Sequence, residues 1–269
     1  MKRWQRVRGF PGLAEEVSFA WLGQAGFLVR CGEGYFLIDP YLSDALAVKY
    51  RGTATPHDRM VPAPLQVEDL PGLTAVFCTH RHSDHFDAPT LRQIAARDPG
   101  CRFVVPCAER DFAIEQGLPA ERVAGVDAGE ELGVGAVSVE AIPAAHESLE
   151  RNAKGENRFL GYVFRLRGST VYHSGDTVRF DGLSGLLTQK RVDLALLPVN
   201  GRGKGVPGNL TFSEAVELCR DAGIPQMVPH HFGLFAFNTV DPGELARGCA
   251  ETVDPECLLP DFVSHFFLA

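Results

Sequence analysis

The sequence lacks a surplus of basic residues and any long apolar run. It has 26 Lys and Arg against 34 Asp and Glu, which gives a formal net charge of −8 at pH 7. This balance argues against a nucleic-acid-binding surface, which requires clustered basic side chains. The basic N-terminal segment precedes no apolar core of a signal peptide, and no run is long enough to span a membrane. We therefore expect a cytoplasmic protein with no membrane partner.

Two further motifs are missing. The seven cysteines are odd in number and contain no Cys-x-x-Cys pair, so we expect reduced, buried thiols. No Gly-x-Ser-x-Gly turn is present to carry a serine nucleophile. Hydrophobic content of 45% and charged content of 22% are ordinary for a globular enzyme, and we expect residues 1–269 to form a single domain.

Histidine is concentrated in one short segment. Residues 79–85 read Thr-His-Arg-His-Ser-Asp-His and follow an apolar run, residues 74–78, that is typical of a buried strand. Imidazole and carboxylate side chains suit zinc or manganese, and iron is possible. His80 and His82 alternate along an extended loop and can bind one ion, while Asp84 and His85 can bind a second. The alternative is a polar surface loop that happens to be rich in His.

Other ligand-type residues also follow apolar runs. They are His146 after residues 134–145, Asp176 after residues 161–172, and the adjacent His230 and His231 after residues 224–229. Loops that leave several strands of an α/β protein meet at one rim, where active sites form. The distribution therefore predicts one shared metal site.

The order of these residues resembles the metallo-β-lactamase superfamily of hydrolases. An upstream Asp39, in Leu-Ile-Asp-Pro, is similar to the first motif of that superfamily. Residues 173–177, 197–211 and 229–239 further resemble the L-ascorbate-6-phosphate lactonase-like branch. The resemblance implies an α/β fold, a four-layer αββα sandwich.

The resemblance also implies roles for the motif residues. His80, His82 and His146 would hold a first divalent ion, and Asp84, His85 and His231 a second. Asp176 would bridge both ions, and a metal-bound hydroxide between them would be the nucleophile. Asp84 and Asp176 are accordingly the catalytic candidates.

Some roles stay open at this point. In the superfamily Asp39 supports the ligands by hydrogen bonding, but an Asp that caps the turn before Pro40 is an equal alternative. His231 matches the Pro-x-His pattern of the family, and His230 is the alternative ligand because neighbouring side chains of an extended segment point in opposite directions. We interpret His173 as a packed or supporting residue.

A glycine-rich loop supplies the candidate substrate residues Asn200, Arg202 and Asn209, together with Lys204. An arginine fork suits a phosphate or carboxylate, which predicts a small anionic substrate. A flexible, solvated loop is the alternative. The oligomeric state is not readable from the sequence.

Three functions compete. The first is metal-dependent hydrolysis of a small lactone or related carbonyl ester, with a phosphorylated substrate included. The second is a phosphodiesterase acting on a nucleotide or a lipid head group, since the same dinuclear site cleaves P–O bonds. The third is a non-catalytic metal-binding domain, against which the intact set of ligands argues.

Local patterns predict most of the core elements. Expected strands cover residues 17–22, 27–31, 35–38, 75–79, 102–105, 134–142, 159–167, 192–198 and 224–228, and expected helices cover residues 89–97, 109–116, 213–222 and 242–252. Residues 40–72 are predicted to form a long loop with one helical turn near Leu46.

Overall fold

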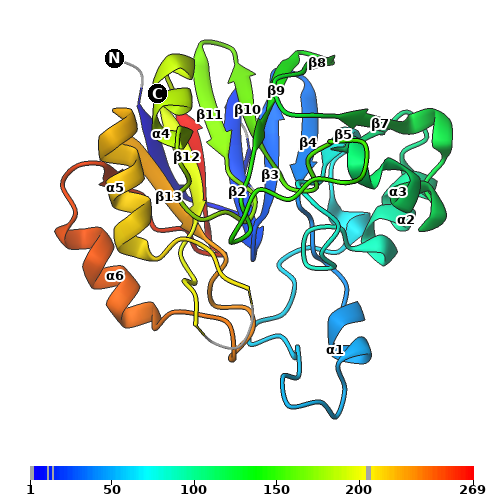
Figure 1. Ribbon diagram of the computed structural model, residues 1–269, viewed down its shortest axis with the longest axis horizontal. Helices are drawn as coiled ribbons and strands as arrows, with labels where there is room; N and C mark the ends of the chain where they lie inside the picture. The colour runs from blue at the N-terminus through cyan, green and yellow to red at the C-terminus, as the bar shows by residue number, and fades with distance from the viewer. Residues whose placement is uncertain (1–2, 11, 14, 204–206) are drawn as a thin grey trace.

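Two mixed β-sheets form the centre of the molecule in this computed structural model, which describes residues 3–10, 12–13, 15–203 and 207–269 (Figure 1). The first sheet has the order β1 (Trp4–Arg8), β15 (Ser264–Leu268), β2 (Val17–Gly23), β3 (Gly26–Cys31), β4 (Gly34–Ile38), β5 (Leu73–Phe77), β6 (Arg102–Pro106), β7 (Val123–Val126). The second has the order β14 (Glu256–Cys257), β13 (Gln226–His230), β12 (Leu194–Pro198), β11 (Ser169–His173), β10 (Leu160–Leu166), β9 (Val137–Pro143), β8 (Glu131–Val134).

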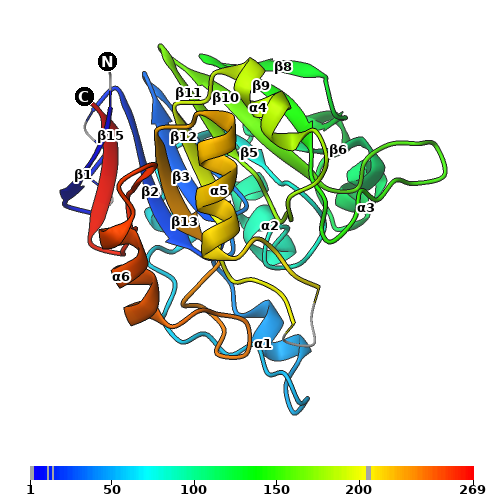
Figure 2. The same ribbon diagram turned by 60° about the vertical axis from the view of Figure 1, so that its left-hand side comes forward.

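Helices cover the outer face of each sheet. On the first sheet lie α2 (Ala88–Arg97) and α3 (Arg110–Glu115), and on the second lie α4 (Leu183–Lys190), α5 (Phe212–Ala222) and α6 (Pro242–Glu251) (Figure 2). The short helices η1 (Val67–Asp69), η2 (Cys107–Glu109) and η3 (Ala120–Arg122) lie in connections. This arrangement confirms the predicted four-layer αββα sandwich.

Aromatic side chains fill the space between the sheets. The ring of Phe164 on β10 lies 5.3 Å from Phe36 on β4 and 5.1 Å from Phe77 on β5, measured between ring centroids. All three rings are buried. Burial of large apolar rings is a major part of the stabilising free energy, and here it fixes the two sheets against each other.

The predicted elements recur with small shifts at their ends. The predicted helical turn near Leu46 is α1 (Ala45–Lys49), and Thr211 caps α5 in a capping box with Glu214. The strands β1, β7, β8, β11, β14 and β15 and the helix α4 were not predicted. Of these, β1 and β15 pair with each other although they lie at opposite ends of the chain (Figure 2). Four of the five residues in β1 are exposed, so β1 has no apolar alternation to detect.

One expectation about cysteine is wrong. Cys249 and Cys257 form a disulfide, so not all seven thiols are reduced. The five others are free, and four of these are buried.

Among the described helices, none combines the length and apolar character that a membrane span requires. The prediction of a single domain over residues 1–269 stays a prediction.

Candidate metal centre

Loops that leave four strands bring the seven predicted metal ligands to one rim of the sandwich. Residues 79–85 follow β5, His146 follows β9, Asp176 follows β11, and His231 follows β13. Within the first loop, the amides of His85 and Phe86 both donate to the carbonyl of His82. This turn brings Asp84 and His85 back towards His80.

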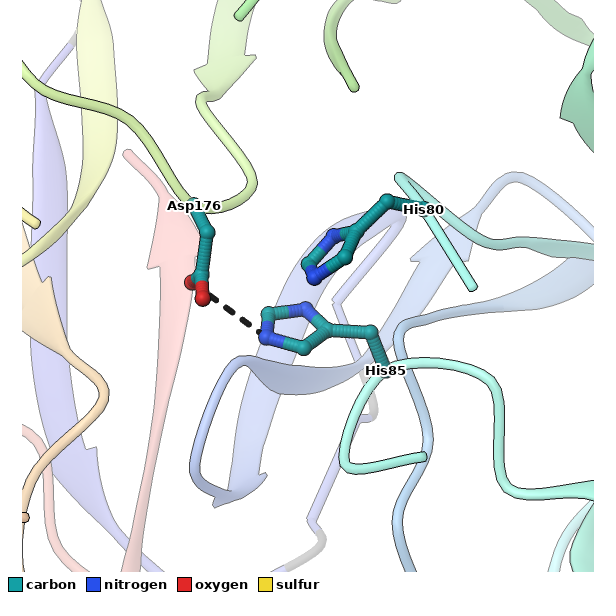
Figure 3. Close-up of side chains that lie close together, drawn as sticks. All are labelled: His80, His85 and Asp176. Carbon is teal, nitrogen blue, oxygen red and sulfur yellow. Dashed lines mark ion pairs between the residues drawn. The ribbon is translucent and has the colours of Figure 1, made fainter. Parts of the chain in front are cut away.

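Potential ligand atoms lie close together in three overlapping groups. The groups are His80, His85 and Asp176; His82, His146 and Asp176; and Asp84, His85 and His231, each with its atoms within 4.8 Å of one another. Figure 3 shows His80 and His85 turned towards the Asp176 carboxylate. Asp176 is shared by two groups, which is the position that the family resemblance implies for a bridging ligand.

Unpaired atoms in the described structure test whether a metal fits. His80 Nε2, His85 Nε2 and Asp176 Oδ1 are buried and have no hydrogen-bond partner. Leaving such groups unpaired costs about 1–3 kcal/mol each. These nitrogen and oxygen atoms converge without hydrogen bonds, and His85 Nε2 lies 3.2 Å from Asp176 Oδ1. Imidazole nitrogen and carboxylate oxygen are the donors that zinc and manganese prefer. The residues therefore fit a bound divalent cation.

Hydrogen bonds fix which nitrogen of each imidazole is free. The Thr79 hydroxyl donates to Asp39 Oδ2 over 2.7 Å, so it can only accept from His80 Nδ1, 3.0 Å away. His85 Nδ1 donates to Asp39 Oδ2 over 2.7 Å. His146 Nδ1 donates to the Gly208 carbonyl over 3.2 Å. In all three rings Nε2 is left to bind a metal.

Asp39 lies behind the ligands. Its carboxylate is buried and accepts hydrogen bonds from the Thr79 amide, the Thr79 hydroxyl and His85 Nδ1. It belongs to none of the three ligand groups. This geometry supports the role of orienting His85 rather than that of a cap for the turn before Pro40.

The two adjacent histidines on β13 and its loop have different surroundings. His231 has a positive φ of 62°, and its Nε2 lies 3.3 Å from Asp176 Oδ1. His230 instead stacks on His173, with ring centroids 4.9 Å apart. His173 Nε2 donates to the Ala25 carbonyl over 2.9 Å and its Nδ1 accepts from the Gly175 amide. The structure thus brings His231 to the ligand groups and leaves His173 and His230 packed beside them.

Gly175 allows Asp176 to reach this position. Its φ is +60°, and an added Cβ would lie 2.7 Å from the Leu160 carbonyl oxygen and 2.8 Å from Thr79 Cβ. A larger residue would push the Asp176 loop away from the histidine loop. Gly175 therefore sets the close approach of the two loops that carry most of the ligands.

Gln24 also belongs to the site, although the sequence indicated only a turn between strands at this position. Gln24 is buried, and its Nε2 donates to Asp84 Oδ2 over 2.8 Å and lies 3.1 Å from His231 Nε2. An isolated glutamine in a glycine-containing turn carries no motif that could have identified it. Its role depends on the packing of the β2–β3 turn against the second sheet.

Burial and charge shift the pKa values of the ligands in opposite directions. Burial lowers the pKa of His80 well below its usual value, which keeps this ring neutral. Burial also disfavours protonation of His231, but the carboxylates of Asp176 and Asp84 outweigh it and raise its pKa to about 9. In the same way Asp176, Asp39 and Asp84 overcome burial and raise the pKa of His85.

These shifts predict that metal binding releases protons. In the metal-free protein a pKa of about 9 keeps His231 protonated at neutral pH, whereas a metal requires neutral imidazole. Apparent metal affinity should therefore rise with pH until His231 is neutral, near pH 9. Calorimetric titration of zinc in buffers of different ionisation enthalpy measures the protons released, and equal heats in every buffer would contradict the prediction.

A cavity of about 400 Å³ opens beside the ligands that the family resemblance implies for the second ion. Its lining includes Asp84, Asp176 and His231 from the metal groups, and side chains from α1 and from residues 235–238. A smaller cavity of about 250 Å³ reaches His80, His82 and His146. Arg81 and His82 line both cavities, so the larger and smaller cavities meet at the metal groups.

The predicted substrate residues differ in whether they reach the larger cavity. Asn209 lines the larger cavity, and its amide donates to Asn200 Oδ1 over 3.1 Å. Asn200 in turn donates to Asn238, another lining residue, over 2.9 Å, so Asn200 connects two side chains of the wall. Arg202 donates to the Asn209 carbonyl and forms an ion pair with Glu214, and it does not line either cavity. Lys204 lies outside the described residues.

Comparisons with known proteins agree with this geometry. Residues 35–232 match the model of the Beta-lactamase superfamily domain. The chain is 30% identical over 255 residues to a UPF0173 metal-dependent hydrolase of Myxococcus xanthus, covering 90% of this chain and 81% of that protein. It is 25% identical over 205 residues to a probable L-ascorbate-6-phosphate lactonase of Escherichia fergusonii, covering 71% of this chain but 57% of the lactonase.

A solved structure has the same fold. The isothiocyanate hydrolase from Delia radicum gut bacteria superimposes with a TM-score of 0.77 at 21% identity, covering 94% of this chain and 100% of that one. At this identity the likeness concerns the fold alone.

Proposed function

Because the chain belongs to the metallo-β-lactamase superfamily of metal-dependent hydrolases, in its lactonase-like branch, we propose that it hydrolyses a small lactone or related carbonyl ester. The observation that carries this proposal is the set of ligand groups sharing Asp176 at the floor of an open cavity of about 400 Å³. This volume suits a small molecule. We further propose that the protein acts in the cytoplasm on an anionic substrate.

The ligand set divides into two halves in this proposal. As the family resemblance implies, His80, His82 and His146 would hold one divalent ion and Asp84, His85 and His231 the other, with Asp176 shared between them. In the structure His80 lies in a group with His85 and Asp176, and His82 lies in a group with His146 and Asp176. When bound, such ions supply an activated water and polarise the carbonyl oxygen of the substrate. Zinc and manganese suit these ligands best, and iron is also compatible with them.

Residues of the chain perform the remaining steps. Asp39 and Thr79 hold His85 and His80 so that Nε2 of each ring points to the metal groups. Burial opposes ionisation of Asp84, but His85 and His231 lower its pKa, so it stays a carboxylate. Asp84 Oδ2 accepts a hydrogen bond from Gln24 Nε2, and we assign the Asp84 carboxylate as the group that accepts a proton from the attacking water.

The direct test is a substrate panel with defined metal content. Purified protein loaded with zinc or manganese should approach two ions per chain and should open lactones faster than it cleaves bis(p-nitrophenyl) phosphate. Preference for the phosphodiester would replace the proposed reaction with phosphodiester cleavage. Stoichiometric metal without hydrolysis of any compound in the panel would support a non-catalytic metal-binding role.

A further inference from the structure

The part of the larger cavity that holds no metal ligand is built from two segments far apart in the sequence. Residues 45–57, which include α1, supply one side, and Phe235 and Phe237 supply the other. In both views α1 projects from the rim of the sandwich (Figures 1 and 2). We call Tyr50, His57, Phe235 and Phe237 the aromatic wall.

His57 is held in the middle of the aromatic wall. Its ring stacks on Tyr50 with centroids 4.1 Å apart and lies 4.5 Å from Phe237 and 5.1 Å from Phe235. Its Nδ1 donates to the Thr55 carbonyl over 2.8 Å. The orientation of the His57 ring is therefore fixed, and its Nδ1 proton is already used by the Thr55 carbonyl.

Arg59 anchors this segment to the rest of the protein. Its largely buried guanidinium donates to the carbonyls of Tyr41 and Ser43 and lies 4.3 Å from the centre of the Tyr41 ring. Its backbone forms a β-bridge with Phe235, and the Met60 amide donates to the Leu234 carbonyl. A wall fixed in this way loses little further conformational freedom when a ligand binds.

Apart from the metal ligands, the charged side chains that line the larger cavity are cationic. Among the described lining residues, the only carboxylates are Asp84 and Asp176, while Lys49 and Arg81 are cationic. Lys49 is exposed, lies 5.1 Å from the centre of the Tyr50 ring, and has no carboxylate partner among the described residues. A local cationic surface of this kind, on a chain of net charge −8, favours an anion.

We propose that Lys49, Tyr50 and His57 form a subsite for the anionic end of the substrate. The Lys49 ammonium binds an oxygen of a carboxylate or phosphate, the Tyr50 and His57 rings form the flat side of the subsite, and an apolar or planar body packs on Phe235 and Phe237. The scissile carbonyl then lies at the metal ligands at the other end of the cavity. This inference rests on the proposed hydrolase function and replaces Arg202, which is paired with Glu214, as the source of charge selection.

Binding of inert probes tests the subsite apart from hydrolysis. Titration calorimetry with benzoate, phenyl phosphate and neutral benzamide is done on the metal-loaded and the metal-free protein. Lys49→Met keeps the length of the side chain and should weaken binding of the preferred anion about tenfold, the value of one charge-assisted contact, while benzamide binding stays unchanged. Lys49→Arg should restore most of the affinity. The anion that loses more affinity in Lys49→Met identifies carboxylate or phosphate as the chemistry recognised.

Controls separate a local from a general effect of charge. Lys154→Met removes the same charge from an exposed residue that does not line the larger cavity, and it should bind both anions as the parent does. Anion binding that Lys49→Met leaves unchanged would place the anion at the metals and overturn the subsite. Failure of both anions to bind the parent would overturn it as well. If the subsite is overturned but neutral lactones are hydrolysed, the proposed function still stands. If anions bind through Lys49 but no substrate is hydrolysed, only the proposed hydrolysis is overturned.

Discussion

Asp176→Asn is expected to lower kcat/KM about a thousandfold and to remove most of the bound metal, because metal ions contribute several kcal/mol to transition-state stabilisation and about 1.4 kcal/mol corresponds to a factor of ten in rate. The Asp176 carboxylate belongs to two of the three ligand groups, and its Oδ1 lies 3.2 Å from His85 Nε2 and 3.3 Å from His231 Nε2. Asparagine replaces one carboxylate oxygen by an NH2 group, which cannot bind a cation, and removes the negative charge.

The comparison with Asp39→Asn makes this expectation specific. Asp39 accepts hydrogen bonds from His85 and Thr79 and, among the described residues, belongs to no ligand group, so replacing its carboxylate should cost about 10–100-fold in metal affinity or activity. Asp181→Asn is a control at an exposed position in the connection between β11 and α4, which also carries Asp176. Its metal content and activity should match those of the parent. Metal analysis and steady-state kinetics on the three variants measure the order. If Asp39→Asn strips the metal as completely as Asp176→Asn, Asp39 is itself a ligand.

The ligand positions could be predicted because their signal is local. Residues 79–85 hold four ligand-type side chains after one apolar strand, and the other candidates each follow a strand. Loops at strand ends of an α/β fold meet at one rim whatever the details of packing. The same reasoning explains why the elements that carry the site, such as β5 and β13, were predicted within a few residues of their observed ends.

The substrate side of the cavity could not be predicted in the same way. His57 was the one histidine besides His265 that followed no strand, and nothing in residues 40–72 indicated which rim that loop would cover. Its position depends on the β-bridge between Arg59 and Phe235 and on the burial of Arg59, contacts that join segments far apart in the sequence. The pairing of β1 with β15 escaped prediction for the same reason, since long-range pairing leaves no periodic pattern in an exposed strand.

Arg202 illustrates a different limit. A guanidinium on a glycine-rich loop beside a predicted site is a reasonable anion-binding group from sequence alone. The structure gives this side chain a nearer partner, Glu214, which also caps α5 with Thr211. Whether the charge of Arg202 is available to a ligand therefore depends on how its loop folds back onto the start of α5, a tertiary contact that leaves no local pattern in the sequence. The anionic substrate stays a prediction, with Lys49 as its proposed contact.

His82→Ala should lower metal content towards one ion per chain and reduce turnover about a thousandfold, since the ions supply several kcal/mol of transition-state stabilisation. His82 forms a ligand group with His146 and Asp176, and it is the exposed member of that group. Loss of the His82 imidazole leaves His80, His146 and the shared Asp176 for the first ion, one ligand fewer, which weakens metal binding at this position. Because His82 faces both cavities, the space left by the truncation is open to solvent.

Because this space is open to solvent, rescue by added imidazole is a second measurement that tests the prediction. Added imidazole can enter the vacated space in His82→Ala, so part of the lost metal and turnover should return with increasing imidazole concentration. His265→Gln is the control, because His265 lies on β15, bonds to Glu15 and the Gly9 carbonyl, and belongs to no ligand group. It should keep its metal and show no response to imidazole. Full activity of His82→Ala without imidazole would mean that the group of His82, His146 and Asp176 is not the catalytic centre.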